Sequence, residues 1–225
     1  MMDTERVRII TEAITYSRRF AGNWFVVHAR PGSIDPLAVS SDILMLRSLG
    51  IHVAVVVPES AYPELDALAV DLRKALNRDD LTAVVLHWEE TRAQDVARQR
   101  PRRWQAMGES AAVVVVVRCA EESSREAALT LAVECGAAKL VLLEPDWNPA
   151  ALPVGGPGQP APSADEVRPY LPGLGPDSAA AAAALAVGAV EAGVSEVHIV
   201  PTEGNPHPIL LEIFTEAGIG TWIGG

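Results

Sequence analysis

Several polar residues in this sequence follow short apolar segments, where a fold could bring them to one edge of a sheet. His28 and Arg30 stand at the end of one such segment, followed by Pro31 and Gly32. Arg30 could supply positive charge to an anion, whereas a histidine is mostly neutral at pH 7 and a proline has no amide to donate. Glu59 follows the next apolar segment, and its carboxylate would repel a phosphorylated ligand.

Other kinds of site are not indicated by the spacing of the reactive residues. No nucleophile stands beside a base in a catalytic arrangement, and no spacing typical of a metal site occurs. The two cysteines, Cys119 and Cys135, imply no disulfide framework and are expected to be small buried residues. The sequence therefore predicts no metal site and a protein of a reducing, cytoplasmic compartment.

Charge and hydropathy exclude two classes of partner. The chain of 225 residues carries a formal net charge of −11, which argues against nucleic acid because phosphate backbones need clustered Lys and Arg. The one basic run, 98–103, is more typical of a solvated surface. No apolar stretch reaches the ~20 residues that a membrane span needs, and the charged N-terminus does not resemble a signal peptide. We therefore expect neither nucleic acid nor a membrane as a partner.

Apolar segments and amphipathic or alanine-rich segments alternate along the whole chain. Strands that are apolar throughout and alternate with helices are typical of a parallel sheet covered on both faces. The sequence predicts a single three-layer α/β/α sandwich with a mostly parallel central sheet, and the Pro- and Gly-rich segment 145–176 is expected to be a surface excursion with a short helical stretch at 164–170. The expected strands are 24–28, 51–57, 81–87, 111–117, 139–143 and 197–200, and the expected helices are 5–20, 35–49, 62–76, 89–107, 123–135, 177–192 and 209–217.

Two stretches resemble N-acetylglutamate kinase, a member of the amino acid kinase family. Residues 12–57 contain a helix with a tyrosine, a glycine before the first strand, and the phrase DILMLRSLGI before the second strand. Residues 189–223 contain LLEIFTEAGIGT, the most specific phrase, and 126–143 match more weakly. The resemblance covers about half of the chain and implies the fold of that family, with an N-terminal lobe at 1–115 and a C-terminal, nucleotide-lobe equivalent at 116–225.

The resemblance also identifies positions where residues for phosphate transfer are expected but this sequence has other residues. His28 occupies the position of a lysine, Arg30 lies in place of a glycine-rich turn, and Ser178 with an alanine run replaces a late lysine-containing phrase. Glu121 or Glu122 could imitate the aspartate of the Asn-Ala-Asp motif, although a solvated helix terminus is the simpler interpretation. Because backbone amides and lysines stabilise the charge of the transferred group, the sequence predicts a shortened and degenerate relative.

A second group of matching residues is implied to form an effector site. Arginine-inhibited relatives hold arginine between the N-terminal helix and the C-terminal lobe, and the matching residues are Tyr16, His198, Glu212 and Gly218. A carboxylate such as that of Glu212 can bind a guanidinium through two hydrogen bonds. The alternative is that these residues only hold the first and last helices in place. The same relatives form hexamers through the helix matching 5–20, which implies a homo-oligomer.

Three functions remain compatible with the sequence. The first is a binding or regulatory protein without phosphoryl transfer and without a cofactor, which the resemblance links to arginine biosynthesis. The second is an active kinase of N-acetylglutamate or a related acylated acidic amino acid, which would need ATP and Mg²⁺ and a replacement lysine, Lys74 or Lys139. The third is a subunit of an N-acetylglutamate synthase, which would need a separate acetyltransferase partner.

Overall fold

The centre of the protein is a seven-stranded sheet with the strand order β3-β4-β2-β1-β5-β6-β7. The computed structural model describes residues 15–16, 18–30, 35–58, 66–78, 83–89, 111–118, 121–174, 178–215 and 218–224. Neighbouring strands from β3 to β6 are parallel, and β7 runs antiparallel to β6. The strands are β1 (Trp24–Ala29), β2 (His52–Pro58), β3 (Ala83–Glu89), β4 (Ala112–Arg118), β5 (Lys139–Glu144), β6 (Glu196–Pro201) and β7 (Thr221–Gly224).

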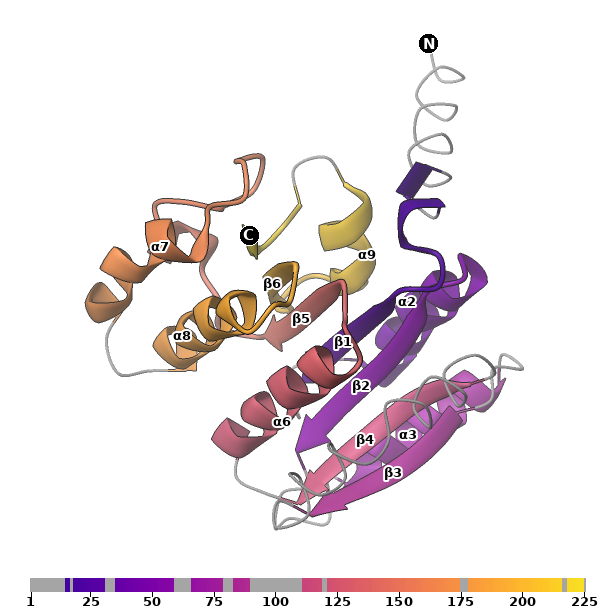
Figure 1. Ribbon diagram of the computed structural model, residues 1–225. Helices are drawn as coiled ribbons and strands as arrows, with labels where there is room; N and C mark the ends of the chain where they lie inside the picture. Colours follow the sequence, from indigo (N-terminus) through magenta and orange to yellow (C-terminus); the bar gives the residue numbers. More distant parts are fainter. Residues whose placement is uncertain are drawn as a thin grey trace.

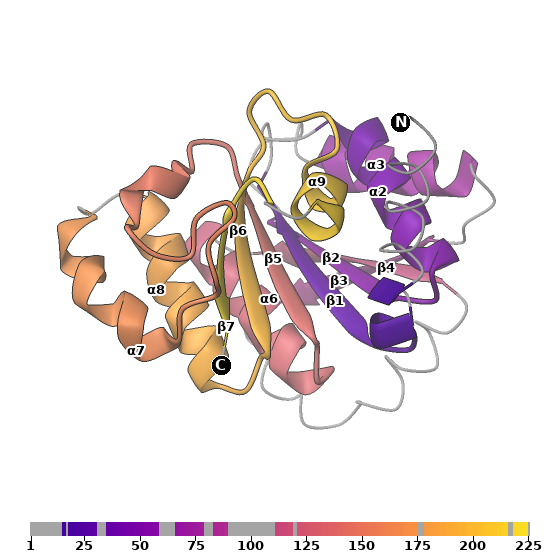
Figure 2. The same ribbon diagram turned by 90° about the horizontal axis from the view of Figure 1, so that it is seen from above.

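Helices cover both faces of this sheet (Figures 1 and 2). One face packs against α2 (Pro36–Ser48), α3 (Asp66–Arg78) and α9 (Pro208–Phe214). The other packs against α6 (Glu121–Glu134), α7 (Ala164–Val167) and α8 (Ser178–Glu191). Alternate residues of β1 enter the two cores, and all six are buried, as expected for a strand covered on both sides. The predicted three-layer α/β/α sandwich is confirmed.

Local sequence signals set several helix ends. The Asp35 carboxylate accepts a hydrogen bond of 2.9 Å from the amide of Leu37 and caps α2. At the other end of this helix, Gly50 has φ = 79°, a conformation that glycine adopts without strain. Ser163 and Glu166 form a capping box that starts α7 within the Pro- and Gly-rich segment. These signals explain why the predicted helices at 35–49 and 164–170 are present.

Other boundaries differ from the predictions. The helix expected at 62–76 contains α3 (Asp66–Arg78), which ends two residues later than expected, whereas 62–65 lie outside the described residues. The last helix ends at Phe214 because Thr215 is extended. Strand β7 was not predicted. Of the expected helix 5–20, residues 15, 16 and 18–20 are described and helical, and of 89–107 only Glu89 is described, as the last residue of β3. Residues 115 and 116, between which the lobe boundary is expected, both belong to β4, and the division into two lobes stays a prediction.

The Pro- and Gly-rich segment adds to the sheet at its β7 end. The amide of Trp222 donates to the carbonyl of Gly155, and the amide of Gly224 donates to the carbonyl of Pro162, both at 3.0 Å. Gly155 has φ = 73°, and a Cβ atom there would lie 2.6 Å from the carbonyl oxygen of Trp222. The segment therefore lies against the outer edge of β7, with glycine required at the closest approach.

Within the described parts of the chain, no helix combines the length and apolar character needed to cross a membrane. The same residues contain no group of three or more His, Cys, Asp or Glu side chains placed to hold a metal ion. Cys135 is a half-buried free thiol, and burial raises its pKa to about 12, so it stays protonated at neutral pH. Cys119 lies outside the described residues.

Candidate ligand-binding pocket

The carboxyl ends of β1 and β5 mark the point where the strand order reverses, since β2 lies on one side of β1 and β5 on the other. Open α/β sheets bind ligands at such a point. His28 and Arg30 lie at this edge, together with Pro58 at the end of β2 and Glu144 at the end of β5. Two of the residues that replace expected phosphate-binding positions, His28 and Arg30, therefore lie at one edge of the sheet.

A buried ion cluster occupies this edge. Arg125 on α6 binds Glu144 through two hydrogen bonds of 2.9 Å, from Nε to Oε1 and from Nη2 to Oε2. Arg30 adds a third at 3.2 Å to the same carboxylate. The side chains of Arg125 and Glu144 are 4% and 3% exposed, so this is an interior pair with the geometry that favours strong charge-assisted bonds. Arg125 was not singled out from the sequence.

His28 is completely buried beside this cluster. Its Nε2 lies 2.8 Å from the hydroxyl of Ser124, and its Nδ1 has no hydrogen-bond partner. Burial, with the charges of Arg125 and Arg30, lowers the pKa of His28 to about 3. A neutral buried imidazole cannot replace the positive charge of a lysine. Ser178 starts α8, but its side chain, like the loops 31–34, 59–65, 119–120 and 175–177, lies outside the described residues.

The buried state of His28 predicts a pH dependence of folding. The pKa of His28 falls from 6.5 to about 3 on folding, so the unfolded chain binds the extra proton and stability is lost as the pH falls from 6.5 toward 3. We expect His28→Gln to remove about 1.4 kcal/mol per pH unit from the acid slope of the free energy of unfolding between pH 6 and 5. Urea unfolding of both proteins across this interval measures it, and equal slopes would contradict the assignment.

The four residues predicted for an effector site lie together at the opposite end of the sheet. Tyr16, His198, Glu212 and Gly218 line a cavity of about 180 Å³. The cavity lies near the amino ends of β5 and β6, on the face of the sheet that packs against α9. Its wall comes from the helical residues before β1, from α9, from the loop before β7 and from β7 itself. These segments are far apart in sequence, and folding of the sheet brings them together.

Glu212 holds the loop before β7 in place. Its Oε2 accepts hydrogen bonds from the amides of Ile219 and Gly220 at 2.8 and 2.7 Å, and its Oε1 lies 2.8 Å from Nδ1 of His198. Burial alone would raise the pKa of Glu212, but His198 and the two amides outweigh it and lower the pKa. A Cβ atom at Gly218, where φ = 65°, would lie 3.0 Å from Glu212 Oε2. Both carboxylate oxygens are therefore engaged within the protein.

Lys139 and Glu196 form the charged part of the cavity. They are register partners at the first positions of β5 and β6, and their side chains form a short ion pair. Lys139 Nζ also lies 3.0 Å from Nε2 of His198. Because an ammonium can only donate, Nε2 accepts and Nδ1 carries the proton given to Glu212. Burial lowers the pKa of Lys139 despite the attraction of Glu196.

Glu196 is the more accessible of the two pocket carboxylates, since its side chain is 15% exposed and that of Glu212 is 4% exposed. Burial opposes its ionisation, but the attraction of the Lys139 ammonium, which is paired with Oε2, outweighs burial and lowers the pKa of Glu196. Arg19 adds a contact of 3.3 Å to Oε1 from a side chain that is 71% exposed. Glu196 is therefore ionised at neutral pH and is paired in part with an exposed surface arginine.

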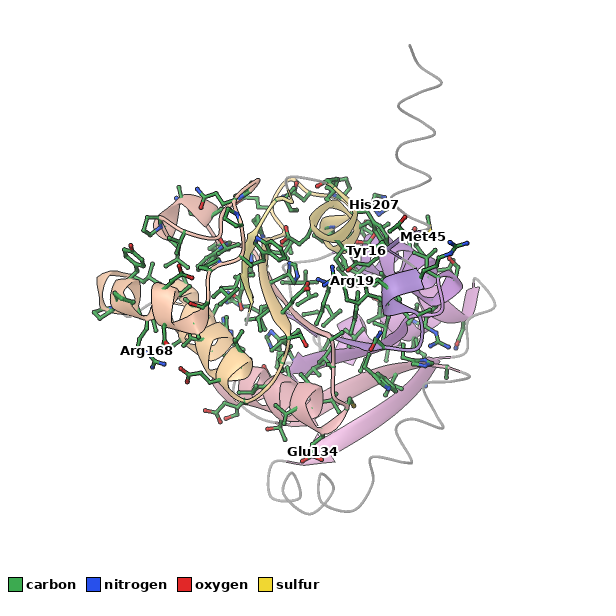
Figure 3. The ribbon with its side chains drawn as sticks, turned by 45° about the horizontal axis from the view of Figure 1, so that its top comes forward. Tyr16, Arg19, Met45, Glu134, Arg168 and His207 are labelled. Carbon is green, nitrogen blue, oxygen red and sulfur yellow. The ribbon has the colours of Figure 1, made fainter. Side chains whose placement is uncertain are left out.

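Tyr16 connects the N-terminal residues to α9 beside the cavity. Its ring lies 4.5 Å from that of Phe20 and 4.9 Å from that of Phe214, measured between centroids. The Tyr16 hydroxyl is buried and has no hydrogen-bond partner, and burial raises its pKa. Figure 3 shows Tyr16 and Arg19 next to each other beside α9. A buried hydroxyl without a partner on a cavity wall is a position where a ligand or water would complete the hydrogen bonding.

Four further residues that line this cavity were not singled out from the sequence: Arg19, Gln159, Glu196 and Trp222. Lys139 was considered only as a replacement kinase lysine, and the structure places it here instead, at the amino end of β5. Lys139 and Glu196 are each the first residue of a mostly apolar strand, which is the one local signal that could have pointed to them. Trp222 lies on the unpredicted β7, where its ring stacks 5.9 Å from that of His198 and its Nε1 donates to the carbonyl of Gln159.

Comparisons with known proteins identify the fold but no close relative. No family model matches the sequence, and no curated protein matches it. Among solved structures, UMP kinase from Ureaplasma parvum is similar over 90% of this chain and 99% of its own, with a TM-score of 0.61 and 12% identity. Carbamate kinase from Giardia covers 91% of this chain and 99% of its own, with a TM-score of 0.62 and 9% identity. A third structure, smu.665 from Streptococcus mutans UA159, covers 79% of this chain and 94% of its own, with a TM-score of 0.53 and 12% identity. The chain therefore has the three-layer α/β fold of these kinases, an amino acid kinase-like fold.

Proposed function

We propose that this protein binds a small amino acid in the cavity between Tyr16, Lys139 and Glu196 and does not transfer phosphate. The observation that carries the proposal is a preformed cavity with both signs of charge and an unpartnered hydroxyl on its wall. The four residues implied by the resemblance to arginine-sensitive relatives line this same cavity. A cytoplasmic regulatory role linked to arginine biosynthesis follows from that resemblance.

The size of the cavity favours a ligand of amino acid size. Its volume of about 180 Å³ is close to the ~150 Å³ of a cavity that holds one benzene molecule. It is well below the ~300–1,000 Å³ typical of sites for larger ligands, so a nucleotide would not fit within it.

The charges favour a zwitterion with a second cationic group. A carboxylate could bind Lys139, the exposed Arg19 and the hydroxyl of Tyr16, and a guanidinium or ammonium could bind Glu196. The aromatic side chains of Tyr16 and Trp222 offer faces on which a guanidinium can stack. L-arginine has all of these groups. Glu212 is the more deeply buried carboxylate and its Oε2 binds two backbone amides, whereas Oε1 of Glu196 contacts the exposed side chain of Arg19. The proposal therefore assigns recognition of the cation to Glu196 and assigns Glu212 to support of the site.

The opposite edge of the sheet supports the absence of phosphoryl transfer. His28 is neutral and buried, and the Arg125–Glu144 pair occupies the end of β5 beside it. Neither lysine considered as a replacement lies there, since Lys139 lines the cavity and Lys74 is an exposed residue of α3 paired with Asp71. Within the described residues, no lysine at this edge could neutralise a transferred phosphoryl group.

Ligand titration tests this proposal. L-arginine at 100 times its dissociation constant is expected to stabilise the protein by about 2.7 kcal/mol, seen as a rise in Tm by differential scanning fluorimetry. Glu196→Gln removes the charge that receives the cation, so we expect at least a tenfold loss of affinity by isothermal titration calorimetry. Glu191→Gln, an exposed substitution on α8, is the matched control and should bind normally. Agmatine, which lacks the carboxylate, should bind weakly.

Two outcomes would contradict it. The first is no response to L-arginine, L-lysine, L-ornithine or L-citrulline in protein shown to be folded. The second is binding of ATP with Mg²⁺ at micromolar affinity, which would favour the alternative of an active kinase of N-acetylglutamate or a related acylated amino acid. The similarity to two kinase folds and the cation pair Arg30 and Arg125 at the switch point favour that alternative. A coupled assay of ADP release over a panel of acylated amino acids decides between them.

A further inference from the structure

We propose that Arg19 occupies the cation position on Glu196 in the empty cavity, is displaced by the cationic group of the ligand, and then binds the carboxylate of that ligand. This role rests on the proposed function, because it concerns how the same cavity selects an amino acid. Arg19 lines the cavity, and its Nη2 lies 3.3 Å from Oε1 of Glu196. A guanidinium of the chain itself therefore makes the contact that the proposed function gives to the guanidinium of the ligand.

Glu196 is paired with two cations that differ in how firmly they are held. Lys139 pairs with Oε2 from a side chain that is 4% exposed, and its Nζ also lies 3.0 Å from Nε2 of His198. Arg19 pairs with Oε1 from a side chain that is 71% exposed. An exposed ion pair contributes at most about fivefold to an equilibrium constant, whereas separating a buried pair is far more costly. An entering cation therefore displaces Arg19 and leaves Lys139 in place.

The backbone of Arg19 is held in place, so the exchange needs movement of its side chain alone. The next residue, Phe20, is buried, and its ring packs against those of Tyr16 and Phe25 at centroid distances of 4.5 and 5.5 Å. Asn23 donates a hydrogen bond of 3.4 Å to the carbonyl of Arg19. The guanidinium of Arg19 lies 4.9 Å from the centre of the Phe20 ring, an attractive contact for a cation. A displaced guanidinium therefore stays beside the cavity.

The charge of the ligand determines where the displaced guanidinium goes. When the cationic group of a ligand binds Glu196, Arg19 loses its carboxylate partner and lies near the Lys139 ammonium. A ligand carboxylate beside Lys139 supplies a new partner, and hydrogen bonds between a guanidinium and a carboxylate are charge-assisted and often bidentate. A zwitterion thus replaces one internal ion pair with two, whereas a cation without a carboxylate only breaks the internal pair. Arg19 therefore makes the carboxylate a requirement for tight binding.

Isothermal titration calorimetry of Arg19→Gln with two ligands tests the exchange. L-Argininamide keeps the guanidinium and the α-amine of L-arginine but lacks the charge of the carboxylate. Because the variant has no internal competitor on Glu196, its affinity for L-argininamide is expected to rise about two- to fivefold. Because the carboxylate of L-arginine loses its guanidinium partner, the preference for L-arginine over L-argininamide is expected to fall by at least about fivefold.

Arg18→Gln is the matched control, because Arg18 is an exposed neighbouring arginine that does not line the cavity and its loss changes the net charge equally. Its two affinities should match those of the parent chain, and circular dichroism establishes that each variant is folded. If the parent binds L-arginine, an affinity of Arg19→Gln for L-argininamide that does not rise, or an unchanged preference between the ligands, would overturn the exchange and leave the proposed function standing. A parent chain that binds neither ligand would overturn both.

Discussion

Replacing Glu212 with alanine is expected to lower the free energy of unfolding by about 3–5 kcal/mol, because three buried donors lose their acceptor. These donors are the amides of Ile219 and Gly220 and the ring of His198. The Glu212 side chain is 4% exposed, so water cannot readily replace it. The loop before β7 should loosen, and the response to ligand should be lost with it. Urea unfolding followed by circular dichroism measures the first effect.

Two further variants separate the causes of this loss. Glu212→Gln keeps the shape and one acceptor oxygen, so the expected loss is smaller, about 1–2 kcal/mol. Glu191→Ala removes an exposed carboxylate paired with Arg168 and should change stability by less than about 1 kcal/mol. A loss below 1 kcal/mol for Glu212→Ala would show that Glu212 does not organise the loop, and the support assigned to it would be wrong.

Replacing Arg125 with methionine is expected to cost about 3–5 kcal/mol, because it leaves Glu144 buried with one of its two arginine partners. The double substitution Arg125→Met with Glu144→Met should cost less than the single one, since it removes the unpaired charge as well. The difference appears as a coupling energy in a double-mutant cycle, measured by urea unfolding. Arg30 remains in the double variant, but its side chain is 19% exposed and can reach solvent.

The control for this cycle is Arg168→Met, which removes an exposed arginine from a surface pair and should change stability by less than about 1 kcal/mol. A double variant as unstable as the sum of the two single variants would mean that Arg125 and Glu144 act independently. The cluster at the end of β1 and β5 would then not be the interior ion pair described above.

The pattern of apolar residues predicted those strands whose position in the fold is determined by burial on both faces. The strands β1, β2, β4 and β5 are apolar throughout, and a run of this kind has few alternatives to a strand inside a sheet. Strand β7 was missed because it has only four residues, follows two close glycines and alternates between buried and half-buried positions. The strand order could not be predicted either, since it depends on which crossovers pack, and the sequence between strands does not record this.

The candidate site could be predicted in part. The phrase containing Glu212 and Gly218 led to two residues of the cavity, and Tyr16 and His198 followed from the same resemblance. Their partners were missed because hydrogen bonding between distant segments leaves no local pattern. Lys139 and Glu196 lie 57 residues apart, and only the parallel register of β5 and β6 makes them neighbours. The role of Glu212 also differs from the expectation, since the amides of the β7 loop already use its oxygens.

The segment against the outer edge of β7 has a consequence for how this chain behaves among other copies of itself. An open sheet ends in a row of unpaired amides and carbonyls that can template a strand from another molecule. Here Gly155 and Pro162 take the two ladder positions that a foreign strand would need, and the prolines flanking this segment cannot extend a ladder further. Pairing with this segment therefore hinders the addition of a strand from another molecule at β7. Deletion of 155–162 would leave the edge of β7 unpaired and is expected to promote aggregation through that edge.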